Sequence, residues 1–228
     1  MFRKPFEGKQ QAHLADTQFE FSQAYLARAR RLLFLRGPLF GIAAGSMSRI
    51  DSFGPTMITD DIMAMNNEDQ KAPIYLVIDS PGGDVSAGMV LYDIIRMSKA
   101  PITTIAQNCA SMATVLMAAG TTRLMFPHSR VMLHLPSGAM QGDADTVEIR
   151  SKELTRVKNS LVDCYIECGV TAALPPSRTG KPPAKAAIRK KILGDINRSE
   201  YWLSAQECVA YGLIDRLATS DDLFGVAA

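Results

Sequence analysis

The chain has few of the residues that would mark it as a metal-binding, disulfide-bonded or membrane protein. Its 228 residues include four cysteines, three histidines and one tryptophan, and no apolar run is long enough to span a bilayer. The cysteines form no CxxC pair, and the histidines do not group with them as a zinc site would require. We therefore expect reduced thiols, no metal, and a cytoplasmic protein that spans no membrane.

An excess of charge of either sign is also missing. The formal net charge is +2, which gives no reason to expect a nucleic-acid partner. Basic residues gather near Arg30 and over 185–191, but exposed helix surface explains both groups. The first residues lack the apolar segment of a secretory signal. The hydrophobic content of 47% favours one globular domain over 18–228, preceded by a flexible arm over 1–17.

Strands and helices are predicted to alternate through the first two thirds of the chain. We expect strands over 31–35, 74–78, 102–106, 123–126 and 130–133, and helices from Asp16 and over 52–66, 86–97 and 111–119. Strand–turn–helix units of this length favour right-handed crossovers and a mostly parallel sheet. Functional groups then belong at the carboxyl ends of the strands.

The last third of the chain is predicted to be mainly helical. A long helix is expected over 144–168, and the four prolines within 171–184 indicate a loop or linker. A basic helix over 185–193 follows. Ser204 and Glu207 have the spacing of a capping box, which predicts that a further helix begins there. A short strand is expected to end near Leu217.

Ser111 is a candidate nucleophile at the boundary between a predicted strand and a predicted helix. The N–H of Met112 could face an oxyanion there, and Gly82 and Gly83, which have no Cβ, let a second stretch of backbone approach. Taken alone, a serine at this position is more often a helix cap and a glycine pair more often an ordinary turn. The turn has neither the P-loop nor the GxGxxG spacing of a phosphate site.

His134 is the candidate base, although a lone histidine in an apolar run is more often a core residue. A serine hydroxyl is a poor nucleophile until a base takes its proton, and the oxyanion that forms needs donors already in place. Ser111, His134 and the glycine turn supply these three parts. The sequence therefore favours a serine hydrolase.

Three motifs and the C-terminal segment resemble, in order and spacing, the proteolytic subunit of the Clp ATP-dependent protease family. The motifs are SPGGDVSAG at 80–88, ASM at 110–112 and SRVMLHLP at 129–136, and the segment is YWLSAQECVAYGLIDRL at 201–217. The resemblance extends over about residues 18 to 217. It implies an α/β fold of the crotonase-like (ClpP) superfold, with a parallel sheet, helices and a protruding handle helix over 144–168. It also makes the proline-rich stretch 171–184 an insertion.

The resemblance implies a serine-type endopeptidase that cleaves unfolded polypeptides and short peptides through an acyl-enzyme. It implies Ser111 as nucleophile, His134 as base and later acid, and the N–H groups of Gly83 and Met112 as the oxyanion hole. Counted back from Ser204, the third catalytic position is Glu200. Asp195 and Asn197 remain open as substitutes. Substrate would lie along the residues that follow His134, which are Leu135, Pro136, Ser137, Gly138, Ala139 and Met140.

The same resemblance implies a homo-oligomer of stacked heptameric rings. It implies no cofactor, since ATP would be used only by a partner unfoldase of the AAA+ class. Three alternatives stay open: an inactive structural or regulatory ring subunit, an acyl-CoA-binding enzyme of crotonase fold, and a Ser–Lys peptidase in which Lys152 or Lys158 approaches Ser111.

Overall fold

The computed structural model describes residues 29–39, 55–197 and 199–224. The predicted arm over 1–17 and the helix expected from Asp16 lie outside these residues. Within them the strands are β1 (Leu32–Arg36), β2 (Ile74–Ser80), β3 (Ile102–Ala110), β4 (Thr122–Met125), β5 (Arg130–Leu133), β6 (Tyr201–Ser204) and β7 (Arg216–Leu217). The helices are α2 (Pro55–Glu68), α3 (Val85–Met97), α4 (Met112–Ala118), α5 (Ala144–Glu167), α6 (Lys185–Ile196), α7 (Ala205–Tyr211) and α8 (Ser220–Phe224).

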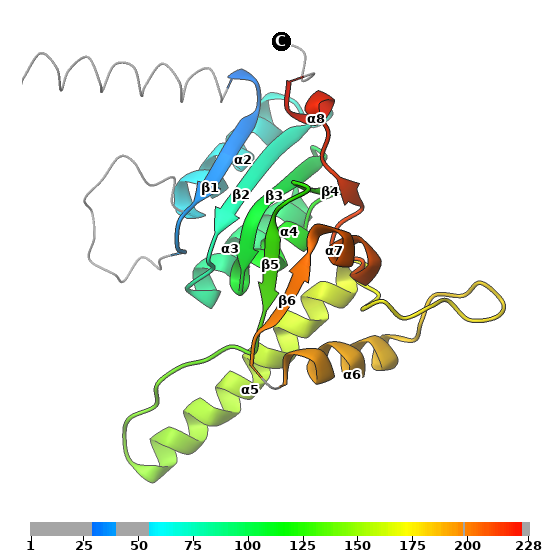
Figure 1. Ribbon diagram of the computed structural model, residues 1–228. Coiled ribbons are helices and arrows are strands. Elements are labelled where there is room, and N and C mark those ends of the chain that lie inside the picture. The colour runs from blue at the N-terminus through cyan, green and yellow to red at the C-terminus, as the bar shows by residue number, and fades with distance from the viewer. Residues whose placement is uncertain (1–28, 40–54, 198, 225–228) are drawn as a thin grey trace, which may run out of the picture.

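The seven strands form one sheet that is parallel except at one edge (Figure 1). Strands β1, β2, β3, β4 and β7 lie side by side in that order and run parallel. Strand β5 pairs in parallel with the end of β3, and β6 pairs antiparallel with β5. The predicted mostly parallel α/β sheet is confirmed.

The described helices cover the two faces of the sheet very unequally. Helices α2, α3 and α4 pack on one face and bury a large apolar cluster that includes Ile62, Leu91 and Leu116. The other face carries a small cluster centred on Val77, Ile105 and Leu124. Because neighbouring strand residues point to opposite faces, β2 and β3 contribute to both clusters. Most of the hydrophobic stabilisation therefore lies on the helical side.

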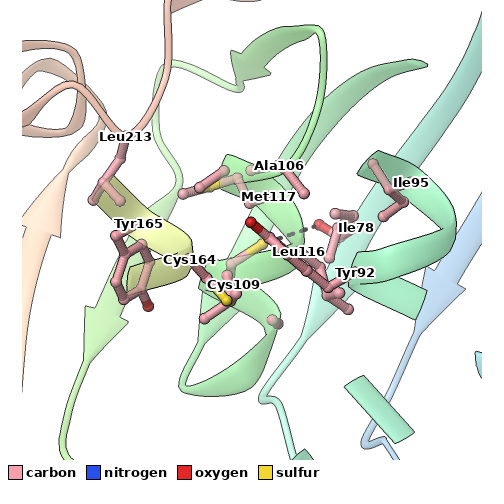
Figure 2. Packing of buried hydrophobic residues seen from close by; sticks show 14 of the residues in the cluster. Ile78, Tyr92, Ile95, Ala106, Cys109, Leu116, Met117, Cys164, Tyr165 and Leu213 are labelled. Carbon is pink, nitrogen blue, oxygen red and sulfur yellow. Dashed lines mark hydrogen bonds between the residues drawn. The ribbon is translucent and has the colours of Figure 1, made fainter. Parts of the chain in front are cut away.

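Helix α5 joins this core only through its C-terminal end. Figure 2 shows Cys164 and Tyr165 of α5 close to Cys109, Leu116 and Met117 of β3 and α4, and all five residues are buried. The N-terminal half of α5 extends away from the sheet (Figure 1). The predicted bounds of 144–168 differ from the helix by one residue at the C-terminus. The side chain of Asp143 starts the helix by accepting the N–H of Thr146 at 2.7 Å.

Three predicted elements are longer in the structure, and the first is β2, which continues two residues past its expected end to Ser80. Strand β3 was expected to end at Ala106, where polar Gln107 and Asn108 interrupt the apolar pattern, but it continues to Ala110 because β5 pairs with its last residues. Helix α6 continues three residues past the expected end, with Ile196 buried. The stretch 171–184 is neither helix nor strand, as predicted, and a turn closes it where Ser177 N–H donates to Lys181 O at 2.8 Å.

The C-terminal elements follow local signals in the sequence. Ser204 and Glu207 form the predicted capping box at the start of α7, and Gly212 ends that helix in the left-handed conformation, at φ 79°. Arg123 of β4 then pairs with Asp215 and donates to the carbonyl oxygens of Cys168 and Gly212. This arginine holds the C-terminal turn and the end of α5 against the sheet.

All four cysteines are free, and all but Cys168 are buried. None of the helices in the described ranges combines the length and apolarity needed to cross a membrane.

Candidate active site

The pairing of β3 with β5 brings Ser111 and His134 together. Ala110 lies opposite Met132 in these parallel strands, and the N–H of Ser111 donates to Met132 O at 2.8 Å. Ser111 directly follows β3 and His134 directly follows β5, so both side chains emerge at the same edge of the sheet. His134 Nε2 lies 2.6 Å from Ser111 Oγ, which is a hydrogen bond. This contact joins two residues 23 positions apart in the chain.

The backbone of Ser111 adopts a rare conformation for a residue with a side chain. Its φ of 56° and ψ of −128° lie outside the common regions, and such a residue costs on the order of 1–3 kcal/mol that the surrounding structure must supply. Although Ser111 occupies the N-cap position of α4, its side chain makes no capping hydrogen bond. The hydroxyl bonds to His134 instead, so the N-cap interpretation of this serine does not hold.

The glycine turn after β2 lies directly against Ser111. A Cβ at Gly82 would lie 2.5 Å from Ala110 O, 2.8 Å from Ser111 Cβ and 2.9 Å from Met112 N, so only glycine fits this contact. Gly82 and Gly83 have φ of 84° and 144°, which also favour glycine. Leu39 holds the turn in place, donating its N–H to Gly82 O at 2.8 Å and accepting from Asp84 N at 2.9 Å.

The two N–H groups predicted to form an oxyanion hole are available for a ligand. Within the described residues, neither Gly83 N–H nor Met112 N–H donates to a protein acceptor. The close approach of Gly82 to Met112 N places the glycine turn beside the first amide of α4. Two backbone donors next to a serine nucleophile are the arrangement that stabilises a tetrahedral oxyanion.

The pairing of β5 with β6 brings the backbone of Glu200 near that of His134, but the Glu200 carboxylate bonds to another residue. Leu133 and Tyr201 are the last pair of β5 and β6, so His134 and Glu200 are the next residues of the two strands. The Glu200 carboxylate accepts the indole N–H of Trp202 at 2.9 Å. No hydrogen bond connects the second ring nitrogen, Nδ1 of His134, to any described residue.

The two substitutes considered for Glu200 serve other purposes. Asp195 accepts a hydrogen bond from Tyr211 OH at 2.8 Å and pairs with Lys191 at 2.5 Å, so it joins α6 to α7. Asn197 is an exposed residue that follows the last turn of α6. Neither residue contacts His134 among the described interactions.

The segment predicted to bind substrate is an extended stretch with an open backbone. Leu135–Met140 is neither helix nor strand, and within the described residues none of its N–H or C=O groups forms a backbone hydrogen bond. Ser137, Gly138 and Ala139 are exposed, and nothing lies within 4 Å of the position of a Cβ at Gly138. An extended peptide can pair with such a segment as an added strand.

A small hollow of about 30 Å³ opens beside Ser111 and His134. Its apolar lining comes from both sides of the nucleophile and includes Val85, Met112, Val115, Leu161, Val162 and Tyr165. Sequence reasoning missed the contribution of α5. The spacing of Lys158, Leu161, Val162 and Tyr165 places them on one helical face, but the pattern does not show that this face meets α4.

Within the described residues, no lysine bonds to the nucleophile. Lys158 lines the hollow, but the only side chain that hydrogen-bonds to Ser111 Oγ within the described residues is His134. Lys152 is exposed and pairs with Glu148 at 2.5 Å. These contacts disfavour the Ser–Lys alternative.

The thiols do not compete with Ser111 as nucleophiles. Burial raises the pKa of Cys164 to about 11 and that of Cys208 to about 12, so both remain protonated near neutral pH. Burial likewise raises the pKa of Cys109, the cysteine nearest in sequence to Ser111. Among the residues described, no group of three or more histidine, cysteine, aspartate or glutamate side chains could hold a metal.

A hydrogen-bonded serine and histidine, beside two amides that bond to no acceptor within the described residues, at the carboxyl ends of parallel strands, define the site of a serine hydrolase. The sequence model of the Clp protease family matches residues 46–221 of this chain. The chain is also 35% identical over 162 residues to the ATP-dependent Clp protease proteolytic subunit of Oltmannsiellopsis viridis, which covers 70% of this chain and 74% of that relative. The chain therefore belongs to the Clp protease family, as its motifs predicted, and its α/β architecture is that of the family.

Proposed function

We propose that this chain is a serine endopeptidase that hydrolyses unfolded polypeptides and short peptides through an acyl-enzyme. The observation that carries the proposal is the 2.6 Å hydrogen bond between Ser111 Oγ and His134 Nε2. Family membership supports the same reaction. The hydroxyl and the imidazole supply the nucleophile and the base, so the reaction needs no cofactor or metal from this chain.

The first half of the reaction forms an ester. Ser111 Oγ attacks the carbonyl carbon of the peptide bond while His134 Nε2 takes the hydroxyl proton. The carbonyl oxygen becomes an oxyanion, which the N–H groups of Gly83 and Met112 stabilise. His134 then gives its proton to the leaving nitrogen, the C–N bond breaks, and the amine product departs from the acylated Ser111.

The second half repeats these steps with water. His134 takes a proton from water, whose oxygen attacks the ester carbonyl and forms a second oxyanion in the same hole. The proton then passes to Ser111 Oγ as the C–O bond breaks. A carboxylic acid product and the free serine result, so the enzyme is unchanged.

The open backbone of Leu135–Met140 supports binding of the substrate as an extended strand. Main-chain N–H and C=O groups are the same in every peptide, so this mode gives affinity without strict sequence selection. The lining of the small hollow beside Ser111 is mainly apolar, which favours a small apolar side chain of the substrate there.

Glu200 is proposed as the third catalytic residue, after its carboxylate leaves Trp202. A glutamate can orient a histidine in a catalytic triad. Glu200 directly precedes β6, and His134 directly follows β5, the strand with which β6 pairs. Its position outside the hydrogen bonds of the Ser–His pair also favours one alternative, an inactive ring subunit with a structural or regulatory role. Activity of the purified protein separates the two.

The assembly and the partners are proposed from the family. We place this chain in stacked heptameric rings of identical subunits, fed with unfolded polypeptide by an ATP-using unfoldase of the AAA+ class. The near-neutral charge supports neither a nucleic-acid nor a membrane partner. The four free thiols support a reducing compartment, which we take to be the cytoplasm.

A fluorophosphonate probe tests the proposed function directly, because only an activated serine reacts with it quickly. We expect the wild-type protein to label at Ser111 and to hydrolyse a fluorogenic peptide in the presence of EDTA. Ser111→Ala should abolish both. Ser86→Ala, which changes an exposed serine beside the same glycine turn, is the matched control and should behave as wild type. A wild-type protein of normal assembled size that neither labels nor cleaves would overturn the proposal.

A further inference from the structure

A second set of hydrogen bonds holds the backbone on the far side of Ser111. The carbonyl oxygen of Ser111 accepts two bonds from Thr114, one from the N–H at 3.0 Å and one from the hydroxyl Oγ1 at 2.6 Å. The Thr114 hydroxyl also bonds to the hydroxyl of Tyr165, which comes from α5. This chain of contacts runs from the end of α5 to the nucleophile.

The direction of the two hydroxyl bonds follows from the number of protons available. A carbonyl oxygen can only accept, so Thr114 uses its single hydroxyl proton on Ser111 O. The Tyr165 hydroxyl must then be the donor to Thr114 Oγ1. Burial raises the pKa of Tyr165 well above its ordinary value, so this hydroxyl keeps its proton at every working pH. Thr114 is fully buried and Tyr165 is nearly so, which keeps water from replacing either partner.

The Ser111 carbonyl belongs to the same peptide group as the N–H of Met112. A peptide group is planar and its C=O and N–H point in opposite directions, so holding one end sets the direction of the other. Hydrogen bonds accepted by the carbonyl also polarise the group and strengthen its N–H as a donor. The Met112 N–H is one of the two donors of the oxyanion hole.

We propose that Thr114 and Tyr165 are positioning residues that orient the Ser111–Met112 peptide group, and with it the oxyanion donor of Met112. This inference rests on the proposed function. It assigns a catalytic consequence to two buried hydroxyls that act through the Ser111 carbonyl, although the side chain of Tyr165 also lines the hollow beside Ser111. It also makes the C-terminal end of α5 a support of the catalytic amide. The bonds to Ser111 O also help to hold the rare backbone conformation of the nucleophile.

The variants remove hydroxyls with little change of shape. Thr114→Val should lower kcat about tenfold, less than the 100-fold or more that accompanies loss of an oxyanion donor, because the amide remains but is less well aimed. Tyr165→Phe, which leaves the Thr114 bond in place, should lower kcat about threefold. KM should stay within twofold in both, since the oxyanion exists only in the transition state.

The double variant separates positioning from folding. Thr114→Val alone leaves the buried Tyr165 hydroxyl without its partner and should lower the melting temperature, whereas Thr114→Val with Tyr165→Phe removes both polar groups and should recover much of it. The kcat of the double variant should nevertheless stay near that of Thr114→Val, because Tyr165 acts through Thr114. Thr114→Ser keeps the hydroxyl and should restore kcat.

A peptide boronate, which binds as a tetrahedral adduct, gives a second readout. Its affinity should fall by the same factor as kcat/KM in Thr114→Val. Tyr92→Phe is the matched control, because Tyr92 OH also faces the end of α5, 3.4 Å from Glu167 and 3.7 Å from Cys168, away from Ser111. It should keep the wild-type kcat.

Two results would overturn this inference and leave the proposed function standing. In the first, wild type is active and Thr114→Val keeps the wild-type kcat. In the second, the kcat values of the Thr114 and Tyr165 variants follow their melting temperatures. An inactive wild type would overturn the proposed function first and this inference with it.

Discussion

Ser111 and Glu200 are both proposed partners of His134, yet the structure holds them very differently. The Ser111 backbone is bonded at its N–H by Met132 and at its C=O by Thr114, and its side chain bonds to His134. Glu200 is exposed and lies between α6 and β6, and its only hydrogen-bond partner among the described residues is the indole of its near neighbour Trp202. The nucleophile is thus organised within a single chain, whereas the third residue depends on a change of rotamer or on the assembly.

Removing either member of the organised pair should have the largest effect. Ser111→Ala and His134→Ala should each lower kcat by roughly 10⁴ or more, because the members of a catalytic unit lose most of their effect together. Steady-state hydrolysis of a fluorogenic peptide measures the loss, and size-exclusion chromatography should show unchanged assembly. Appreciable hydrolysis by His134→Ala would assign the role of base to another group.

Glu200→Gln tests the loosely held side of the comparison. We expect kcat to fall about a hundredfold, less than the full loss of a buried triad aspartate, because Glu200 begins outside the hydrogen-bonded pair. Glu200→Asp keeps a carboxylate and is the control, with activity closer to wild type. If Glu200→Gln retains full activity, either no third catalytic residue is used or another residue orients His134, and Glu200 is then not part of the catalytic unit.

Arg123→Met tests whether the contacts that hold the C-terminal segment in place also affect the active site. It removes the pair with Asp215 and two bonds to carbonyl oxygens, so we expect about 2 kcal/mol less stability toward urea, with kcat within twofold of wild type. A large loss of kcat at full assembly would mean that this segment is coupled to the nucleophile after all.

The same variant should change the response to acid. Burial alone would raise the pKa of Asp215, but hydrogen bonds from Arg123 outweigh it and hold the pKa below its ordinary value near 3.8. The stabilisation from this pair is therefore complete above about pH 4 and is lost as the pH falls through the lowered pKa. Urea melts at a series of pH values should show a smaller loss in Arg123→Met than in wild type, because the backbone N–H of residue 123 still donates to Asp215 in the variant.

Trp202→Phe should have the smallest effect. It removes the indole N–H that holds Glu200 and keeps an aromatic side chain at a half-exposed position. We expect kcat to rise by up to about threefold, since a surface hydrogen bond is worth about 1 kcal/mol or less. A fall in kcat would show that Trp202 presents Glu200 to His134 instead of withholding it.

Sequence reasoning reached what local patterns and chain order determine. The capping box of Ser204, the helix over 144–168 and the alternating strands all follow from residues close together in the sequence. Ser111 and His134 were predicted because their motifs and the glycine turn resemble the Clp protease family in order and spacing, and the pairing of Ala110 with Met132 explains why they meet.

The contacts that sequence reasoning missed depend on how distant elements cross. Nothing in the neighbourhood of Tyr165 shows that its hydroxyl reaches Thr114, because that contact needs α5 to lie against α4. The sequence left Asp195 open as a partner of His134, but in the structure it bonds to Tyr211 and pairs with Lys191. The Glu200 carboxylate accepts from Trp202, and no pattern in the chain predicts that choice of partner.

The unpaired backbone of Leu135–Met140 has a cost for an isolated subunit. Exposed backbone N–H and C=O groups can pair with any extended polypeptide, so a second copy of the same protein can bind there as well as a substrate. Pro136 has no N–H to offer, so it interrupts that edge at its second residue and shortens the length available for self-association. Isolated subunits should accordingly aggregate more readily than the proposed ring assembly, in which neighbouring subunits would restrict access to this segment.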